Sequence, residues 1–359
     1  MENLNQIILF PFLFSLLLTA VSTPVALFFL KKFNVVDDPN KHKHPAILHK
    51  KPIPRGGGIP LFIGAFVACI IFLPLDKIII ATLIASFISL LVGVLDDKFD
   101  ISPYARFLVN ILCAIFVVFM GASIPFITNP FGGILFLNSI HLPFLQGLSL
   151  PLVSDLIAVL WIVWVMNMLN WSKGVDGQMP GIVAISAIII GILSLRFSPL
   201  DATSTTAAML SFIVAGASLG FLIFNFYPAK IFPGYGATSI YLLLAVASIL
   251  SGAKLATAIL VMGVPMTDGL FTILRRILSG KSPFWHDKKH LHHLLLNLGL
   301  SQRRVALFYW IVSAILGAIA LVLSSKGKLF AIIMLVILVG GALLFLHFLI
   351  NKTDDKTNL

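Results

Sequence analysis

The stretch from Lys77 to Asp100, KIIIATLIASFISLLVGVLDDKFD, decides the fold. From residue 77 to residue 95 it is almost entirely apolar, and about 20 such residues suffice for a helix to cross the hydrocarbon core of a bilayer. The apolar run ends abruptly at two adjacent acids, Asp96 and Asp97. We therefore predict a membrane-spanning helix over 77–95 with two carboxyl groups at one membrane face.

The same apolar pattern recurs along the whole chain of 359 residues. Hydrophobic residues make up 59% of it and charged residues only 11%, whereas a soluble domain carries about 25% charged residues. The run over 7–30 is too long for the apolar part of a signal peptide. We predict a single all-α polytopic membrane domain over residues 1–359. Its eleven candidate spans are 7–30, 57–75, 77–95, 104–122, 153–170, 179–195, 206–225, 237–251, 254–274, 304–324 and 328–350.

Some features lie outside this pattern. The segment 123–151 is rich in Pro, Gly and Phe, and we interpret it as a short extracytoplasmic hairpin. Cys69 and Cys113 lie in apolar runs, which favours small core residues over a disulfide or a metal pair. The net charge of +11 is typical of cytoplasmic loops that face anionic lipid, and we predict no nucleic-acid partner.

The distribution of Lys and Arg predicts the orientation, because cytoplasmic loops of membrane proteins carry an excess of both. We place the N-terminus outside and the C-terminus in the cytoplasm. All Lys and Arg residues then lie inside except Lys77, Arg196, Lys254, Lys326 and Lys328.

Five polar clusters lie on the predicted inner face, each where an apolar run ends. The pair Asp96 and Asp97 is costly to keep near the bilayer edge. A divalent cation, a cationic partner or a proton on one acid would relieve the repulsion between the two carboxylates. The alternative for any single charged residue is a solvated anchor at a helix end.

The first inside loop carries Lys50 and Arg55 and ends in three glycines at 56–58. Glycine at a helix start lets backbone N–H groups approach a phosphate. We therefore predict that Gly57 contacts the substrate through its backbone. The alternative is a flexible hinge with ordinary positive-inside charge.

The third and fourth clusters surround Asp176 and Asn225. Asn167 and Asn170 are three residues apart and share a helix face. Glycines flank the turn that holds Asp176, which suits a broken helix beside a ligand. Candidate binding residues in these two clusters are Asn167, Asn170, Lys173, Asp176, Asn225 and Lys230.

The fifth cluster is the largest. Its HxHH pattern at 290–293 could indicate a metal site, but no cysteine accompanies it and basic residues surround it. Arg, Lys and His in this number favour phosphate recognition. The candidate residues are Asp268, Arg275, Arg276, Asp287, His290, His292 and His293.

With these motifs in place, the chain resembles the polyprenyl-phosphate N-acetylhexosamine-1-phosphate transferase superfamily, the MraY/WecA/TagO-like enzymes of glycosyltransferase family 4. The resemblance covers about residues 30–305, with five motifs in the family's order, and the HxHH form is similar to the WecA/TagO branch. The matching positions run from Asp38 to Gly57, then Gly93, Asp96 and Asp97, then Asn167, Asn170, Gly174, Asp176 and Gly177, then Asn225, Pro228, Ala229, Lys230, Phe232 and Gly234, and from Pro265 to Ser301.

The resemblance implies a phosphotransferase that moves a sugar 1-phosphate from a UDP-N-acetylhexosamine, expected to be UDP-GlcNAc, to undecaprenyl phosphate or a related polyprenyl phosphate. It implies a bacterial inner-membrane location, an active site facing the cytoplasm, and a role in cell-wall or surface polysaccharide synthesis. Asp96, Asp97 and Asp176 would be catalytic. Lys50, Arg55 and Gly57 would close over the substrate, and the arginines and histidines of the fifth cluster would hold the pyrophosphate or sugar.

Two departures from the family pattern concern the cofactor. The family implies Mg²⁺ (or Mn²⁺), here held by Asn170 and Asp97. The first acid of the family's third motif is Lys173 in this chain, and the acid that usually ligates magnesium is Tyr235. Our hypothesis is that the Lys173 ammonium takes over part of the metal's neutralisation of charge.

The alternatives are a catalytically altered or inactive relative, a phospho-MurNAc-pentapeptide transferase, or a membrane transporter, which would carry acids in mid-span within two related halves. A homodimer is implied by family analogy only. The enzyme hypothesis requires that Asp97, Asp176 and His293 meet at one pocket.

Overall fold

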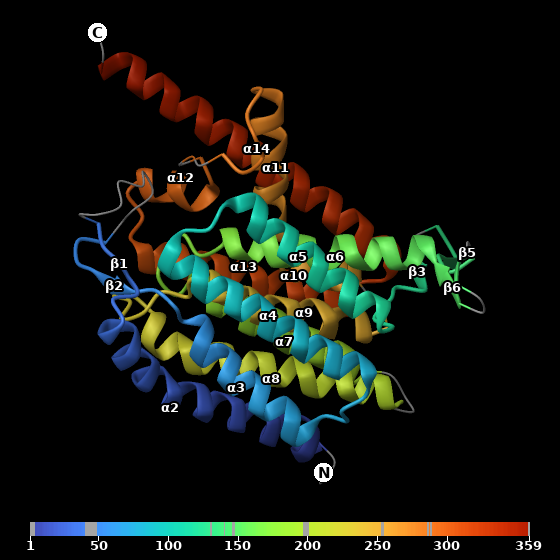
Figure 1. The fold of residues 1–359 in the computed structure, drawn as a ribbon. Coiled ribbons are helices and arrows are strands. Elements are labelled where there is room, and N and C mark those ends of the chain that lie inside the picture. The colour runs from blue at the N-terminus through green and yellow to red at the C-terminus, as the bar shows by residue number, and fades with distance from the viewer. Residues whose placement is uncertain are drawn as a thin grey trace.

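The computed structural model describes residues 4–39, 49–129, 131–139, 141–145, 148–196, 201–252, 255–285, 287 and 289–357. Within these ranges the protein is a bundle of long helices, with short β-hairpins at its two ends (Figure 1). Residues 40–48, which carry the Lys and His of the first family motif, lie outside the described residues.

Every predicted span is helical. The matching helices are α2 (Phe10–Lys32), α3 (Gly58–Phe72), α4 (Lys77–Phe99), α5 (Pro103–Phe119), α6 (Leu152–Trp171), α7 (Gln178–Ser194), α8 (Ala202–Asn225), α9 (Thr238–Leu250), α10 (Leu255–Val261) with α11 (Gly263–Leu278), α13 (Gln302–Val322) and α14 (Ser325–Thr357). Shorter helical segments are η1 (Asn5–Leu9), η2 (Tyr235–Ala237) and α12 (Leu291–Asn297).

The lengths of these helices confirm an all-α polytopic membrane protein. Within the described residues, six helices are long and apolar enough to cross a membrane, or seven if the bent pair α10 and α11 is one span. The apolar helices α3, α5, α7 and η2–α9 are shorter. The count of eleven spans and the orientation therefore stay predictions.

The ninth predicted span, 254–274, is not one continuous helix. It consists of α10 and α11, which meet at a bend of 83°. The cause lies at Pro265, whose ring would collide with the carbonyl group of Val261, the last residue of α10, if the helix continued straight. The ninth predicted span is therefore bent in the structure, and Figure 1 shows α11 standing at a steep angle to most of the other helices.

Helix α9 forms the centre of the bundle. All its residues from Thr238 to Ile249 are buried, which is typical of a helix that is apolar on every side and surrounded by others. It packs against α4, α6 and α8. The segment η2 leads directly into α9, so the central helix fixes the position of Tyr235.

Glycines allow three backbones to meet beside η2. A Cβ atom on Gly93 of α4 would lie 2.4 Å from the Cα of Gly236, and one on Gly58 of α3 would lie 2.2 Å from the carbonyl carbon of Gly236. Only glycine permits such close approach. The contact brings the acidic end of α4 against the start of the central helix.

Short antiparallel hairpins lie at opposite ends of the bundle (Figure 1). At one end, β1 (Val36–Asp37) pairs with β2 (Ile53–Pro54). At the other, β3 (Phe126–Thr128) pairs with β4 (Ile134–Phe136), and β5 (His141–Leu145) pairs with β6 (Leu148–Pro151). The hairpin interpretation of 123–151 is confirmed, and its extracytoplasmic location stays a prediction. Cys69 and Cys113 are both buried and free, as predicted.

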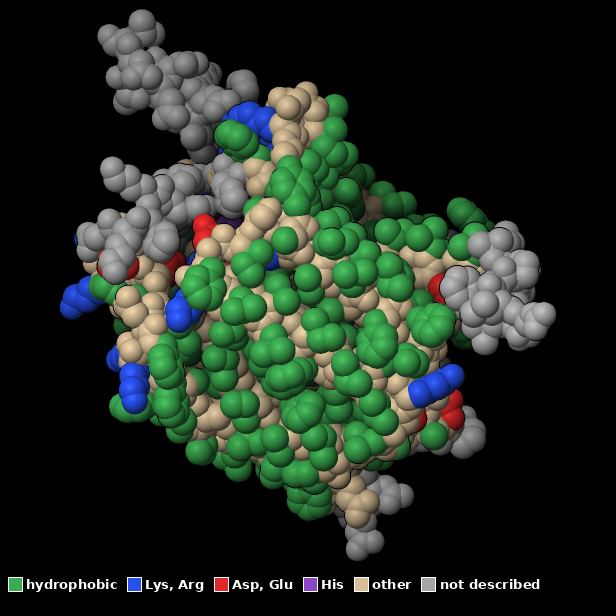
Figure 2. Space-filling view, viewed as in Figure 1, with side chains coloured by type: hydrophobic (Ala, Val, Ile, Leu, Met, Phe, Trp, Pro, Cys, Tyr) green, Lys and Arg blue, Asp and Glu red, His purple; other side chains and the backbone are tan. Residues whose placement is uncertain are grey.

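The surface agrees with a membrane environment. Hydrophobic side chains cover the middle of the face shown in Figure 2, and charged side chains gather toward its edges. Large exposed apolar side chains on α4 and α5 include Ile84, Phe87, Leu108 and Leu112. Apolar surface of this extent marks contact with lipid or a partner.

Replacing Gly93 by Ala should destabilise the bundle by about 1–3 kcal/mol, because the added methyl group meets backbone atoms that cannot move independently. The melting temperature in detergent measures this. Gly341→Ala in α14 is the matched control, since a Cβ there meets no atom within 4 Å. Equal melting temperatures for the two variants would contradict the close packing of α4 on η2.

Candidate active site

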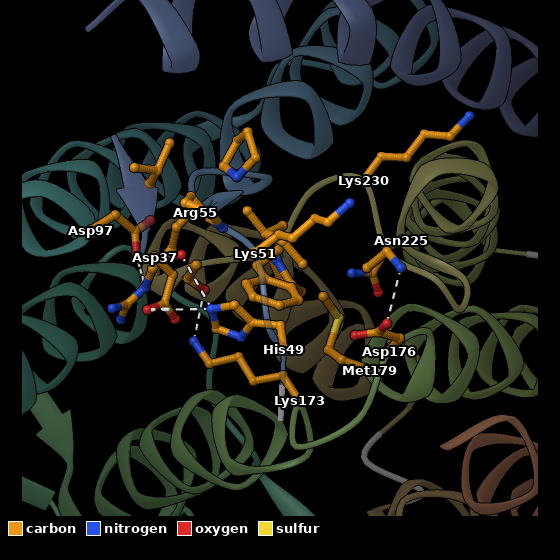
Figure 3. A pocket seen from close by; sticks show the side chains of 18 of the residues that line it. Asp37, His49, Lys51, Arg55, Asp97, Lys173, Asp176, Met179, Asn225 and Lys230 are labelled. Atoms are coloured by element: carbon orange, nitrogen blue, oxygen red, sulfur yellow. Dashed lines mark hydrogen bonds and ion pairs between the residues drawn. The ribbon is translucent and has the colours of Figure 1, made fainter. Parts of the chain in front are cut away.

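A cavity of about 1460 Å³ opens at the end of the bundle that holds β1 and β2. Residues from all five predicted clusters line it, and Figure 3 shows several of them pointing into it. Asp97, Asp176 and His293 meet there, as the enzyme hypothesis requires. The predicted site residues that line the cavity are Lys50, Arg55, Asp96, Asp97, Lys173, Asp176, Asn225, Lys230 and His293.

The cavity carries an excess of positive charge. Among the described residues that line it, eight are Lys or Arg and five are Asp. A cleft lined mainly by one sign of charge concentrates ligands of the opposite sign. The cavity therefore suits a ligand with several negative charges, such as one that carries phosphate groups.

Asp97 is bound from two directions. Its Oδ1 accepts a hydrogen bond of 2.7 Å from the Tyr235 backbone N–H and lies 2.9 Å from Arg55 Nε. Asp97 belongs to the C-terminal turn of α4, yet it faces the N-terminal amides of η2, which leads into α9. Those amides lack partners within their own helix and carry partial positive charge, which favours a carboxylate.

Asp96 is bound by arginine as well. Its Oδ2 lies 2.8 Å from Arg106 Nη1 and 3.7 Å from Arg55 Nη2, and the residue is 1% exposed. A buried carboxylate needs such partners to remain charged. The sequence predicted that a divalent cation, a cationic partner or a proton would relieve the repulsion between the two acids. In the structure, the cationic partners Arg55 and Arg106 do so.

Gly234 links Lys173 to the acid pair. Lys173 Nζ donates a hydrogen bond of 2.7 Å to the Gly234 carbonyl oxygen. On the other side of Gly234, an added Cβ would lie 2.0 Å from Asp97 Oδ2, and φ at this residue is +66°. Glycine is therefore required, and Lys173 and Asp97 approach each other around it.

The surroundings of Lys173 bring its pKa into the neutral range. Burial, followed by the repulsion of Arg55, lowers the pKa of Lys173 to about 7, although the charges of Asp97 and Asp96 act in the opposite direction. Lys173 therefore changes charge near neutral pH.

Tyr235 occupies the position that the family pattern gives to an acid. Its ring lies 4.8 Å from the guanidinium carbon of Arg106 and 5.6 Å from Lys173 Nζ, distances typical of cation–π contacts. Its hydroxyl oxygen accepts a hydrogen bond of 3.0 Å from Asn110 Nδ2. The aromatic ring thus contacts two cations that would otherwise only repel each other.

Asp176 and Asn225 connect two loops. Asp176 Oδ2 accepts a hydrogen bond of 2.9 Å from the Ala229 N–H, and Asn225 Oδ1 accepts one of 3.1 Å from the Gly177 N–H. Asn225 Nδ2 also donates to the Ile231 carbonyl oxygen at 2.8 Å. Burial raises the pKa of Asp176. Both residues hold the loops 172–177 and 226–236 in place around the cavity.

The glycines before α3 do not present free amides to the cavity. The N–H groups of Gly56 and Gly57 donate to the Phe232 carbonyl oxygen, and that of Gly58 donates to the Pro233 carbonyl oxygen. Because the Gly57 amide is already engaged, its predicted contact with phosphate stays a prediction. These glycines instead join the first loop to the fourth.

The two predicted asparagines of α6 also lie outside the cavity lining. Asn167 Nδ2 donates to the Val163 carbonyl oxygen within its own helix at 2.7 Å. Asn170 Oδ1 is buried without a hydrogen-bond partner among the described residues. Their predicted contacts with substrate or metal stay predictions.

A second group of predicted residues braces the edge of the site without lining the cavity. Asp287 accepts hydrogen bonds from Arg275 and Arg276 at 3.0–3.1 Å. Burial alone would raise the pKa of Asp287, but the Lys289 amide and the two arginines lower it to about 2. Because their guanidinium groups are engaged by Asp287, direct binding of substrate by Arg275 and Arg276 stays a prediction.

Asp268 fixes the histidine segment. Its Oδ2 lies 2.8 Å from His290 Nδ1, and its Oδ1 accepts a hydrogen bond of 3.0 Å from the Leu291 N–H at the start of α12. His292 is buried against Gly174, and burial, followed by repulsion from its two neighbouring histidines, lowers its pKa well below the usual value. Of the three histidines, His293 lines the cavity.

Sequence reasoning missed some residues of the site. Arg106, Asn110 and the pair Asp37–His49 take part in it, and His49 Nε2 lies 3.8 Å from Asp37 Oδ1. Arg106 and Asn110 could have been found from the sequence, because a polar residue within a membrane span needs a polar partner and often belongs to a functional site. Gln302, which accepts from the Asp176 N–H at 3.4 Å, carried no such signal.

The residues present do not fit a divalent cation. Hard cations such as Mg²⁺ take oxygen ligands, and Asn170 Oδ1 and Asp96 Oδ1 are buried acceptors without a hydrogen-bond partner among the described residues. Asp97, however, is already neutralised by Arg55, and Lys173 and Tyr235 stand where the family pattern has acids. Among the described residues, no group of three His, Cys, Asp or Glu side chains could hold a metal ion.

Comparison with known proteins places the chain in a family. The model of glycosyl transferase family 4 matches residues 79–252. A probable undecaprenyl-phosphate N-acetylglucosaminyl 1-phosphate transferase of Bacillus subtilis is 31% identical over 91% of this chain and 88% of its own. The decaprenyl-phosphate N-acetylglucosaminephosphotransferase of Mycobacterium tuberculosis is 32% identical over 86% of this chain and 81% of its own.

A third relative, the undecaprenyl-phosphate alpha-N-acetylglucosaminyl 1-phosphate transferase of Haemophilus influenzae, is 30% identical over 89% of this chain and 86% of its own. These similarities extend along most of the chain, and the residues that the family model matches include Asp96, Asp97, Lys173 and Asp176. The chain therefore belongs to the polyprenyl-phosphate hexosamine-1-phosphate transferases of glycosyl transferase family 4, and it is a membrane enzyme that transfers a sugar phosphate to a polyprenyl phosphate.

Proposed function

We propose that the enzyme transfers GlcNAc 1-phosphate from UDP-GlcNAc to undecaprenyl phosphate and releases UMP, at the cytoplasmic face of the bacterial inner membrane. The observation that carries this proposal is the cavity itself, which joins an excess of positive charge to a buried acid pair at one end of an apolar bundle. The names of the relatives support GlcNAc as the sugar and a polyprenyl phosphate as the acceptor.

The reaction needs little covalent help from the protein. A phosphate oxygen of the acceptor lipid attacks the β-phosphorus of the UDP-sugar, and the bond from that phosphorus to the oxygen bridging to the α-phosphorus breaks. UMP leaves with the bonding electron pair, and a dianionic acceptor has no proton to give up. Such chemistry depends on in-line positioning and on stabilisation of charge.

The acid pair serves to position cations. Asp96 and Asp97 are held in charge-assisted contacts with Arg55 and Arg106, so protonation of either carboxylate would weaken an ion pair. The arginines are thereby fixed at the cavity wall, where they can face the phosphates of donor and acceptor. Lys50 and Lys230 are exposed at the same cavity and would attract the anionic donor.

The proposed reaction is tested with purified enzyme in liposomes that contain undecaprenyl phosphate. Radiolabelled UDP-GlcNAc should give lipid-linked GlcNAc pyrophosphate with an equal amount of UMP. UDP-MurNAc-pentapeptide, offered at the same concentration, should give no lipid product. Preference for the pentapeptide donor would contradict the proposed sugar.

Replacing Asp97 by Asn should lower kcat by about 100-fold or more, because Arg55 loses the charge that orients it. Asp155→Asn is the matched control: it makes the same change at the first turn of α6, away from the cavity, and should retain normal kcat. Melting temperatures of both variants show whether the fold survives. Full activity of a folded Asp97→Asn enzyme would remove the acid pair from the mechanism.

The pKa of Lys173, about 7, predicts a pH dependence. As pH rises through 7, Lys173 loses its proton and its positive charge, so kcat/KM should fall on the alkaline side. Lys173→Arg keeps the charge to higher pH, and its kcat/KM should fall only at a clearly higher pH. Superimposable profiles for the two enzymes would show that the charge of Lys173 does not contribute.

A further inference from the structure

The positions that the family pattern assigns to acids are occupied by a cation and an aromatic ring. Lys173 replaces one acid and Tyr235 replaces the one that usually ligates magnesium. Two formal negative charges thus become one positive charge. Compared with the two acids that the resemblance leads us to expect, a protonated Lys173 and a neutral Tyr235 add three positive charges, one more than a magnesium ion carries.

The structure holds this charge in a defined place. Lys173 is anchored on the Gly234 carbonyl oxygen at 2.7 Å, and the Tyr235 ring contacts both Lys173 and Arg106. Cation–π contacts are worth about 0.5–2 kcal/mol each, depending on desolvation. An acid at position 235 would instead form an ion pair with one of these cations and cancel its charge.

At least one oxygen of each acid in the pair is already engaged, while Asp96 Oδ1 and Asn170 Oδ1 have no hydrogen-bond partner among the described residues. Asp97 accepts from the Tyr235 N–H and pairs with Arg55, while Asp96 pairs with Arg106. A divalent ion at this place would have to displace arginine from a buried carboxylate and lie close to the Lys173 ammonium. Both changes are unfavourable in surroundings of low dielectric constant.

We propose that Lys173, Arg55 and Arg106 together act as a built-in replacement for the divalent cation, so that phosphoryl transfer in this enzyme proceeds without a bound metal ion. Tyr235 is the positioning residue of this group, because it keeps two of the cations together without neutralising them. The proposal rests on the proposed transferase function, but its central claim concerns metal binding and is measurable without turnover.

The first experiment measures metal binding to the wild-type protein without substrates. Mn²⁺ is titrated into the purified full-length protein and the free ion is followed by electron paramagnetic resonance. We expect no saturable binding below about 1 mM, and no rise in melting temperature with Mg²⁺ or Mn²⁺. Binding of one Mn²⁺ per chain at micromolar concentration would overturn the proposal, whatever the activity.

The second experiment measures turnover with and without chelator. Lipid-linked GlcNAc should form at rates that agree within about twofold in EDTA and in Mg²⁺. Loss of turnover in EDTA, restored by Mg²⁺, would overturn the inference and leave the transferase function intact. Absence of product under every condition would refute the transferase function instead, and the Mn²⁺ titration would still decide the metal question.

The Mn²⁺ titration of wild type is expected to show no binding, so a variant that is expected to bind Mn²⁺ provides the positive counterpart. Lys173→Asp/Tyr235→Asp restores both acids and should create one Mn²⁺ site with a Kd at least tenfold below that of wild type. Lys77→Asp/Tyr104→Asp makes the same change of charge at two exposed positions outside the cavity and should create no site. Equal Mn²⁺ affinity of the two double variants, both folded by melting temperature, would contradict the assignment.

Discussion

Neutralisation of two adjacent carboxylates inside an apolar bundle is the constraint on which the rest of the structure depends. Asp96 and Asp97 are almost fully buried, and an unpaired buried charge costs several kcal/mol. Their partners come from separate parts of the chain: Arg55 follows β2, Arg106 belongs to α5, and the Tyr235 amide begins the central helix. The first loop, two helices and the bundle core must therefore assemble together to form the site.

Around this centre the site has an inner and an outer layer. Residues of the inner layer line the cavity and carry its charge. The outer layer consists of the Arg275–Arg276–Asp287 contact and the Asp268–His290 contact, which hold α11 and α12 in position beside the loop that carries Lys173. His292 connects the two layers, because it packs directly on Gly174. Several of the polar residues that the sequence marks as functional thus serve to place their neighbours.

Much of the fold follows from the sequence because the relevant forces are local. Apolar runs predict helices, and the polar clusters at their ends predict which loops gather at one face. The ninth span contains Pro265, but the apolar length of the run does not show that the chain bends there by 83°. The hydrogen bonds from the N–H groups of residues 56–58 could not be predicted from the sequence. Their acceptors, the carbonyl groups of Phe232 and Pro233, are about 175 residues away along the chain. For the same reason the sequence could not show that Asp97, an unfavourable residue at the end of its own helix, stabilises the beginning of another.

The bond from the Tyr235 backbone to Asp97 has an evolutionary consequence. A main-chain N–H holds the carboxylate whatever side chain the residue carries, proline excepted. Position 235 is thus free to exchange one functional group for another while the architecture around it stays intact. Homologous enzymes can in this way diverge in their chemistry at a buried position of the site without first evolving a new scaffold.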